Sequence, residues 1–167
     1  MGEAPDLTSR IISLEDSTTF LLESLSSKPL KVLLESQIEI EDPQDDVIRR
    51  TVKLFFESGS MPVLYCVSEL YRRKLKAEEY SLLSETLMPI GKIFHLHNEE
   101  GLIRKMNIKV TRHIDPAMAG RLNVQYPEII CKKYDYCVGE RKIGSICEYF
   151  NEESLVRVWD TKSIKIL

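Results

Sequence analysis

Two charged residues stand among apolar residues in strand-like stretches, and they are the first candidates for chemistry. Arg50 alternates with Ile48 and Val52, and Glu148 follows two residues after Ile146. Since side chains two residues apart point to the same face of a strand, both charges are predicted to face the protein core. A buried charge is costly unless a partner compensates it, so each of these side chains needs a specific environment.

Two interpretations of this pair stay open. Arg50 and Glu148 could form an internal ion pair that serves the fold alone. They could instead line a closed polar cavity for a small anion, in which the planar guanidinium of Arg50 binds a carboxylate through two parallel hydrogen bonds. Charged groups inside a cavity are candidates for a functional site, although structural ion pairs look similar in a sequence.

The rest of the sequence offers little other chemistry. The cysteines form no Cys-x-x-Cys pair, and the histidines stand at no metal-ligand spacing from them. We therefore expect buried free thiols and no metal site. Neither of the common glycine-rich phosphate-binding motifs occurs, and we expect no cofactor. The basic runs Arg72-Arg73-Lys74 and Lys132-Lys133 are interpreted as solvated surface.

Alternation of apolar and polar residues predicts the strands that position the two charges. The six predicted strands cover residues 30–41, 47–57, 62–71, 102–114, 128–138 and 142–150, and residues 154–166 could add an edge strand. The predicted connections are residues 42–46, a hairpin turn at 58–60 and a tight turn at 139–141.

Helical spacing predicts the elements that cover the sheet. A helix begins near residue 7, and a second one, capped by Asp16 or Ser17, runs to about Leu25. Residues 74–100 indicate two helical pieces broken at Pro89. The pattern predicts an α+β fold over residues 1–167 as a single domain: one six-stranded, mostly antiparallel sheet with helices on one face.

Composition excludes several classes of protein. Hydrophobic residues make up 43% and charged residues 29% of the 167 residues, which is typical of globular chains and excludes disorder and coiled coil. The formal net charge of −3 argues against a nucleic-acid partner. No apolar run is long enough to span a membrane, and the first residues lack the order of a secretory signal. We expect a cytoplasmic monomer or weak dimer.

Several short segments, in order along the chain, resemble those of the chorismate pyruvate-lyase family. The matching segments are Leu14–Thr19, Arg50 with its strand and the following Gly59 and Pro62, Pro89–Lys92, the Thr111-Arg112 pair, and Glu148 in the final hairpin. The match covers roughly residues 11–153. The pattern is most similar to the archaeal and mycobacterial branch of chorismate lyase-related proteins.

The resemblance implies a cofactor-free lyase that splits chorismate into 4-hydroxybenzoate and pyruvate inside a cavity closed by two flaps. Arg50 would bind the ring carboxylate, and Glu148 would face the ring's oxygen substituent and handle the proton. Backbone N–H groups near Ile90 or Gly91 and near Thr18 would add hydrogen bonds. Such an elimination needs little beyond orientation and proton transfer, because formation of the aromatic product drives it.

Two other functions stay open. The chain could be a non-catalytic module of the same fold that binds a small aromatic or cyclic carboxylate. Effector-binding domains of one class of bacterial transcription regulators share this fold and bind small acids or sugars. They follow a winged-helix DNA-binding domain, for which the residues before the first predicted strand are too few, so we expect no nucleic-acid partner. A purely structural role for the two charges is the third alternative.

Overall fold

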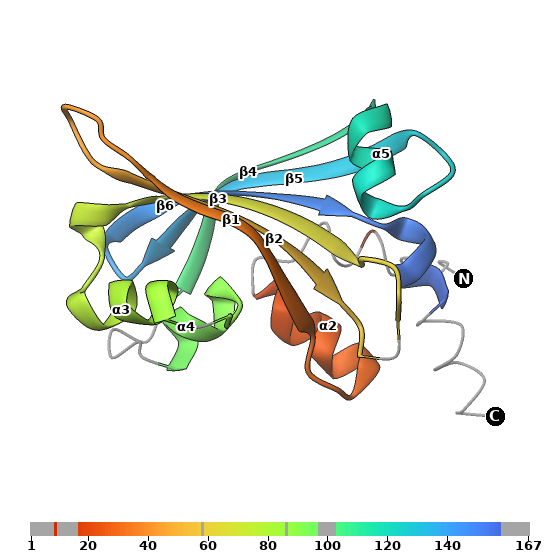
Figure 1. Cartoon of the computed structure of the whole chain (residues 1–167), viewed down its shortest axis with the longest axis horizontal. Coiled ribbons are helices and arrows are strands. Elements are labelled where there is room, and N and C mark those ends of the chain that lie inside the picture. The colour runs from red at the N-terminus through yellow and green to blue at the C-terminus, as the bar shows by residue number, and fades with distance from the viewer. Residues whose placement is uncertain (1–8, 10–16, 58, 86, 97–102, 158–167) are drawn as a thin grey trace, which may run out of the picture.

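A computed structural model describes residues 9, 17–57, 59–85, 87–96 and 103–157. Six strands form one sheet in the order β1-β2-β3-β6-β5-β4, and each neighbouring pair is antiparallel (Figure 1). The strands are β1 (Lys31–Ile40), β2 (Val47–Phe55), β3 (Leu64–Tyr71), β4 (Ile103–Ile114), β5 (Glu128–Val138) and β6 (Arg141–Phe150). The helices are α2 (Thr18–Ser26), η1 (Arg72–Lys74), α3 (Ala77–Glu85), α4 (Ile90–Leu96) and α5 (Pro116–Leu122). The predicted α+β class with a six-stranded antiparallel sheet is confirmed.

Two of the three predicted connections between strands agree with the structure. Residues 41–46 join β1 to β2, as predicted. The turn from β5 to β6 contains Gly139, whose φ of 58° lies in the left-handed region that favours glycine. The connection from β2 to β3 is longer than the predicted hairpin turn at 58–60, because strand pairing stops at Leu54 and Leu64. Residue 58 itself lies outside the described part of the chain.

Three helices cover one face of the sheet, and their boundaries follow the sequence signals (Figure 1). The Ser17 hydroxyl accepts a hydrogen bond from the Phe20 N–H at 3.4 Å and caps α2, as predicted. α3 ends before Pro89 and α4 begins directly after it, which confirms the predicted break. The helix predicted from residue 7 lies almost wholly outside the described residues. Within the described ranges, no helix is long and apolar enough to cross a membrane.

The covered face carries two apolar clusters. One packs around Leu22 of α2, and the other includes Ile93 of α4. On β2, Ile48 belongs to the second cluster and Val52 to the first. Arg50 stands between them on the same face of the strand, so the sheet places a charged side chain at the boundary of the two clusters.

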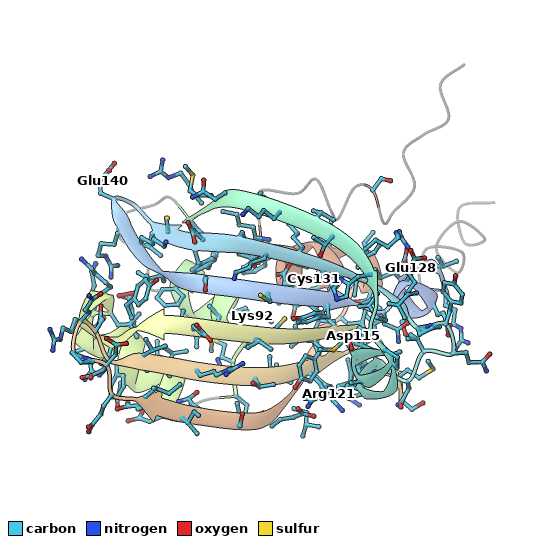
Figure 2. All side chains as sticks on the ribbon, turned by 90° about the horizontal axis from the view of Figure 1, so that it is seen from above. Lys92, Asp115, Arg121, Glu128, Cys131 and Glu140 are labelled. Atoms are coloured by element: carbon cyan, nitrogen blue, oxygen red, sulfur yellow. The ribbon has the colours of Figure 1, made fainter. Side chains whose placement is uncertain are left out.

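α5 packs on the opposite face of the sheet, where the sequence predicted no helix. Asp115 caps it by accepting a hydrogen bond from the Met118 N–H at 2.9 Å, and Leu122 packs with Tyr65 of β3 in a third apolar cluster. Figure 2 looks onto this face and shows Asp115 and Arg121 at one end of the sheet. The sequence analysis assigned no element to the residues between the predicted strands at 102–114 and 128–138.

The predicted edge strand at residues 154–166 is wrong over the part that the structure describes. Residues 152–157 are helical, and the Asn151 side chain accepts a hydrogen bond from the Ser154 N–H at 3.1 Å at the start of this turn. Leu155 is 1% exposed while Val156 is 48% exposed. The apolar residues here follow a helical rather than a strand pattern; residues 158–166 lie outside the described part.

Candidate functional site

All five residues proposed from the sequence line one cavity between the sheet and the helices α2 and α4. They are Thr18, Arg50, Ile90, Gly91 and Glu148, and the cavity has a volume of about 50 Å³. Arg50 is 1% exposed and Glu148 is 4% exposed, so both charges are buried, as the alternation predicted. The structure thus brings the five together, while their roles in binding or catalysis stay predictions.

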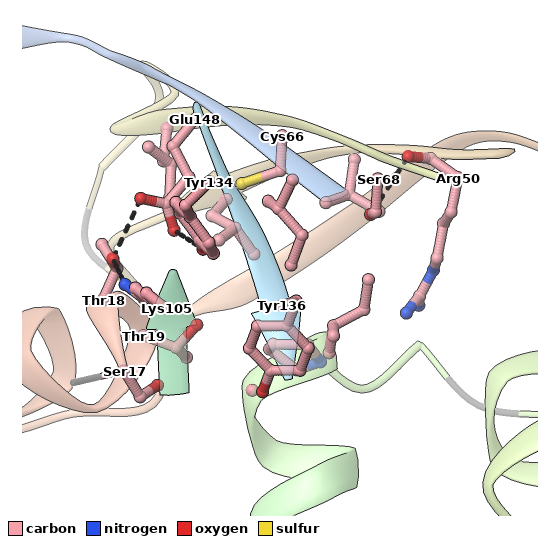
Figure 3. A pocket seen from close by; sticks show the side chains of 17 residues that line it. Ser17, Thr18, Thr19, Arg50, Cys66, Ser68, Lys105, Tyr134, Tyr136 and Glu148 are labelled. Atoms are coloured by element: carbon pink, nitrogen blue, oxygen red, sulfur yellow. Dashed lines mark hydrogen bonds between the residues drawn. The ribbon is translucent and has the colours of Figure 1, made fainter. Parts of the chain in front are cut away.

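Glu148 lies at one end of the cavity with both carboxylate oxygens engaged. Its Oε2 accepts a hydrogen bond from the Thr18 hydroxyl at 3.0 Å, and its Oε1 accepts one from the Tyr134 hydroxyl at 2.8 Å (Figure 3). Burial, and then the neighbouring Glu148 carboxylate, raise the pKa of Tyr134 well above its usual range. Tyr134 therefore keeps its proton and serves as a permanent donor to Glu148.

Lys105 extends this chain of hydrogen bonds, and the sequence analysis missed it. Its ammonium donates to the Thr18 hydroxyl at 2.8 Å and lies 4.6 Å from the centre of the Tyr134 ring. Lys105 is 6% exposed and lines the cavity. The Thr18 hydroxyl consequently accepts from an ammonium and donates to a carboxylate. Figure 3 shows the ammonium, hydroxyl and carboxylate in sequence.

The interpretation of the Lys132-Lys133 pair as solvated surface is wrong for Lys132. Lys132 is fully buried at 0% exposure, whereas Lys133 is exposed. Lys132 pairs with Glu148 in the register of β5 and β6 and lies on the same face as Ile130 and Tyr134. The alternation that identified Arg50 and Glu148 was present here too, and it should have marked Lys132 as buried.

Arg50 lies at the other end of the cavity. Its Nη1 donates to the Met88 carbonyl, which is 3.0 Å away in the segment before α4. Burial lowers the pKa of Arg50 from its usual value. Figure 3 shows the guanidinium turned away from Glu148, with Cys66 and Ser68 between the two residues. The two charges therefore have separate partners at two ends of one cavity, and they do not form the simple internal ion pair.

The helices α2 and α4 meet at the cavity and bring Thr18, Ile90 and Gly91 to its wall. A Cβ atom added to Gly91 would lie 2.8 Å from the Ser17 hydroxyl, which is closer than van der Waals contact. Lys92 of α4 forms an ion pair of 2.6 Å with Glu23 of α2. The rings of Phe20 and His95 add a contact between the two helices, with centroids 4.7 Å apart.

The cysteines are the remaining reactive side chains, and one of the four, Cys66, lines the cavity. In the described part of the chain, no group of three or more His, Cys, Asp or Glu residues could hold a metal ion. The four cysteines are free; Cys66 is buried in the cavity wall. Cys131 and Cys147 hydrogen-bond to each other on neighbouring strands, and Cys131 pairs in register with Tyr149, which packs in the cluster beneath α5.

Comparison with known proteins identifies the fold but no family. No family model matches the chain, and no curated protein matches it. Among solved structures, the ligand-binding domain of a putative GntR-family transcriptional regulator from Bordetella bronchiseptica has a TM-score of 0.55 at 14% identity, over 73% of this chain and 82% of that one.

PhnF from Mycobacterium smegmatis has a TM-score of 0.61 at 10% identity, over 84% of this chain and 66% of that one. The separate effector domain of PhnF has a TM-score of 0.54 at 11% identity, over 83% of this chain and 90% of that one. At these identities the likeness shows the fold alone. The chain has the chorismate lyase-like fold that GntR ligand-binding domains share.

Proposed function

We propose that this chain is a binding domain for a small organic acid, with Arg50 as the anchor for the acid group. The observation that carries the proposal is a buried guanidinium at one end of a cavity whose other end carries Glu148, Thr18 and Lys105. A guanidinium binds a carboxylate through two parallel, charge-assisted hydrogen bonds, which gives both affinity and orientation. The structural neighbours described as ligand-binding and effector domains support the same class of function.

The size of the cavity bears on the ligand. Its volume of about 50 Å³ is smaller than the ~150 Å³ of an engineered cavity known to hold benzene. An aromatic acid therefore fits only if α2 and α4 separate. This movement would break the close approach of Gly91 to Ser17 and the ion pair of Lys92 with Glu23. The small aromatic or cyclic carboxylate expected from the sequence remains our proposed ligand, and its binding requires that α2 and α4 separate.

A second candidate is the chorismate lyase reaction, which the presence of Arg50 and Glu148 in one cavity favours. In this reaction the bond between the ring carbon and the enolpyruvyl oxygen breaks, and the neighbouring ring carbon that carries the hydroxyl loses a proton, so that the ring becomes 4-hydroxybenzoate. The enol that leaves takes up a proton on carbon to become pyruvate. Glu148 would have to exchange its hydrogen bonds from Thr18 and Tyr134 for a contact with the substrate. The structural neighbours described as ligand-binding and effector domains support binding rather than this reaction.

One experiment separates the two functions. Calorimetric titration with 4-hydroxybenzoate is expected to show binding that Arg50→Met weakens at least about a hundredfold, as for the loss of two hydrogen bonds to a charged group. Arg49→Met is the matched control, because Arg49 lies next in sequence with its side chain 50% exposed. Wild-type affinity in Arg50→Met would refute the anchor. Incubation with chorismate tests the second candidate: equimolar 4-hydroxybenzoate and pyruvate, lost in Glu148→Gln, would establish the lyase.

A further inference from the structure

The Thr18 hydroxyl joins two buried charges. It accepts a hydrogen bond from Lys105 at 2.8 Å and donates one to Glu148 at 3.0 Å. The three residues come from α2, β4 and β6, and none is more than 6% exposed. This end of the cavity therefore stabilises one kind of group, a hydroxyl placed between an ammonium and a carboxylate.

We propose that Lys105 is a specificity-determining residue that, together with Glu148, selects acids carrying a hydroxyl group. The ligand carboxylate binds Arg50, and the ligand hydroxyl takes the place of the Thr18 hydroxyl: it accepts from Lys105 and donates to Glu148. This inference rests on the proposed function. Thr18 is the first residue of α2, so its side chain leaves the cavity when α2 and α4 separate to admit a ring.

The ammonium of Lys105 restricts the ligand group that can bind at this end of the cavity more than the Glu148 carboxylate alone would. A carboxylate accepts from any donor, including an amine. An ammonium only donates, so the group between the two must both accept and donate, as a hydroxyl does. An acid that places a C–H bond there leaves two buried charges poorly satisfied, and sites of this kind discriminate strongly against ligands that lack the hydroxyl.

The test compares acids with and without the hydroxyl. Dissociation constants of 4-hydroxybenzoate, 3-hydroxybenzoate and benzoate are measured by calorimetry for the wild type, Lys105→Met and Lys109→Met. Of the two hydroxybenzoates, the one that the wild type binds more tightly should bind at least about tenfold more tightly than benzoate, as for one hydrogen bond to a charged group. Lys105→Met should reduce this preference, because only Glu148 then bonds the ligand hydroxyl, and it should bind benzoate no more weakly than the wild type, because one buried charge fewer is left unsatisfied. Lys109→Met, an exposed position on the same strand, should keep the preference.

Each other result contradicts a specific claim. Equal wild-type affinity for all three acids overturns the inference and leaves the proposed function intact. If Lys105→Met weakens benzoate and hydroxybenzoate equally, the role of Lys105 is structural. Binding of none of the acids by the wild type refutes the proposed function itself. If Lys105→Met does not fold, Thr18→Val provides the test: it removes the hydroxyl that the ligand hydroxyl replaces between Lys105 and Glu148 and should tighten the binding of hydroxybenzoate, and unchanged or weaker binding overturns the inference.

Discussion

Replacement of Thr18 by valine should destabilise the protein far more than the same change at the next residue. Valine has nearly the shape of threonine, and both have similar helix propensity, so the change removes little besides the hydroxyl. That hydroxyl makes two buried hydrogen bonds, each to a charged group, at 2.8 and 3.0 Å. Leaving a buried polar group without its partner costs about 1–3 kcal/mol, and more when the group is charged.

We therefore expect Thr18→Val to lower the free energy of unfolding by about 3 kcal/mol, which corresponds to a fall in Tm of roughly 6–12 °C in a domain of this size. Urea denaturation followed by circular dichroism measures the change, and an unaltered m-value shows that only stability changed. Thr19→Val is the matched control, because Thr19 is also buried beside the cavity but lies outside the Lys105–Thr18–Glu148 chain.

The reasoning would be refuted if Thr18→Val unfolded within about 0.5 kcal/mol of the wild type, the range of an ordinary surface substitution. It would also be refuted if Thr18→Val and Thr19→Val cost the same. A double-mutant cycle with Glu148→Gln adds a second check, since residues joined by a hydrogen bond are expected to show a coupling energy above about 0.5 kcal/mol.

Two further predictions concern a cysteine pair and a pair of helical glycines. The hydrogen bond from Cys131 lowers the pKa of Cys147 to about 7. The rate at which iodoacetamide alkylates Cys147, mapped by mass spectrometry, should therefore reach half its maximum near pH 7. Cys131→Ala should move the pH of this half-maximum upward. Equal rates at pH 7 in the two proteins would contradict this. Gly120→Ala should raise the free energy of unfolding, measured by urea denaturation, by about 0.5–1 kcal/mol, because a Cβ there meets nothing within 4 Å. Gly91→Ala should not, because its Cβ would lie 2.8 Å from the hydroxyl of the capping residue Ser17, and an equal gain in both variants would refute that contact.

Strand alternation was sufficient to find Arg50 and Glu148, because each alternates with buried apolar residues: Ile48 and Val52 flank Arg50, and Ile146 and Phe150 flank Glu148. The same rule applied to β5 would have found Lys132, which lies between the buried Ile130 and Tyr134. It was missed because two adjacent lysines were interpreted by their charge rather than by their phase in the strand.

Lys105 could not be found in this way. A register shift between Met106 and Lys109 interrupts the alternation on β4, so the residues before and after it follow different phases. The partnership of Lys105 with Thr18 also depends on tertiary structure, because these residues are far apart in the sequence. The helix over residues 116–122 is too short for a clear period, although its start at Asp115 and Pro116 has the capping signals of a helix.

The central claim is that the cavity binds an organic acid through Arg50, and a crystal structure of the protein with 4-hydroxybenzoate tests it most directly. The account predicts the carboxylate within hydrogen-bond distance of the Arg50 guanidinium, the hydroxyl near Lys105 and Glu148, and a wider separation of α2 and α4. An acid bound outside the cavity, or inside it with the carboxylate away from Arg50, would contradict the account.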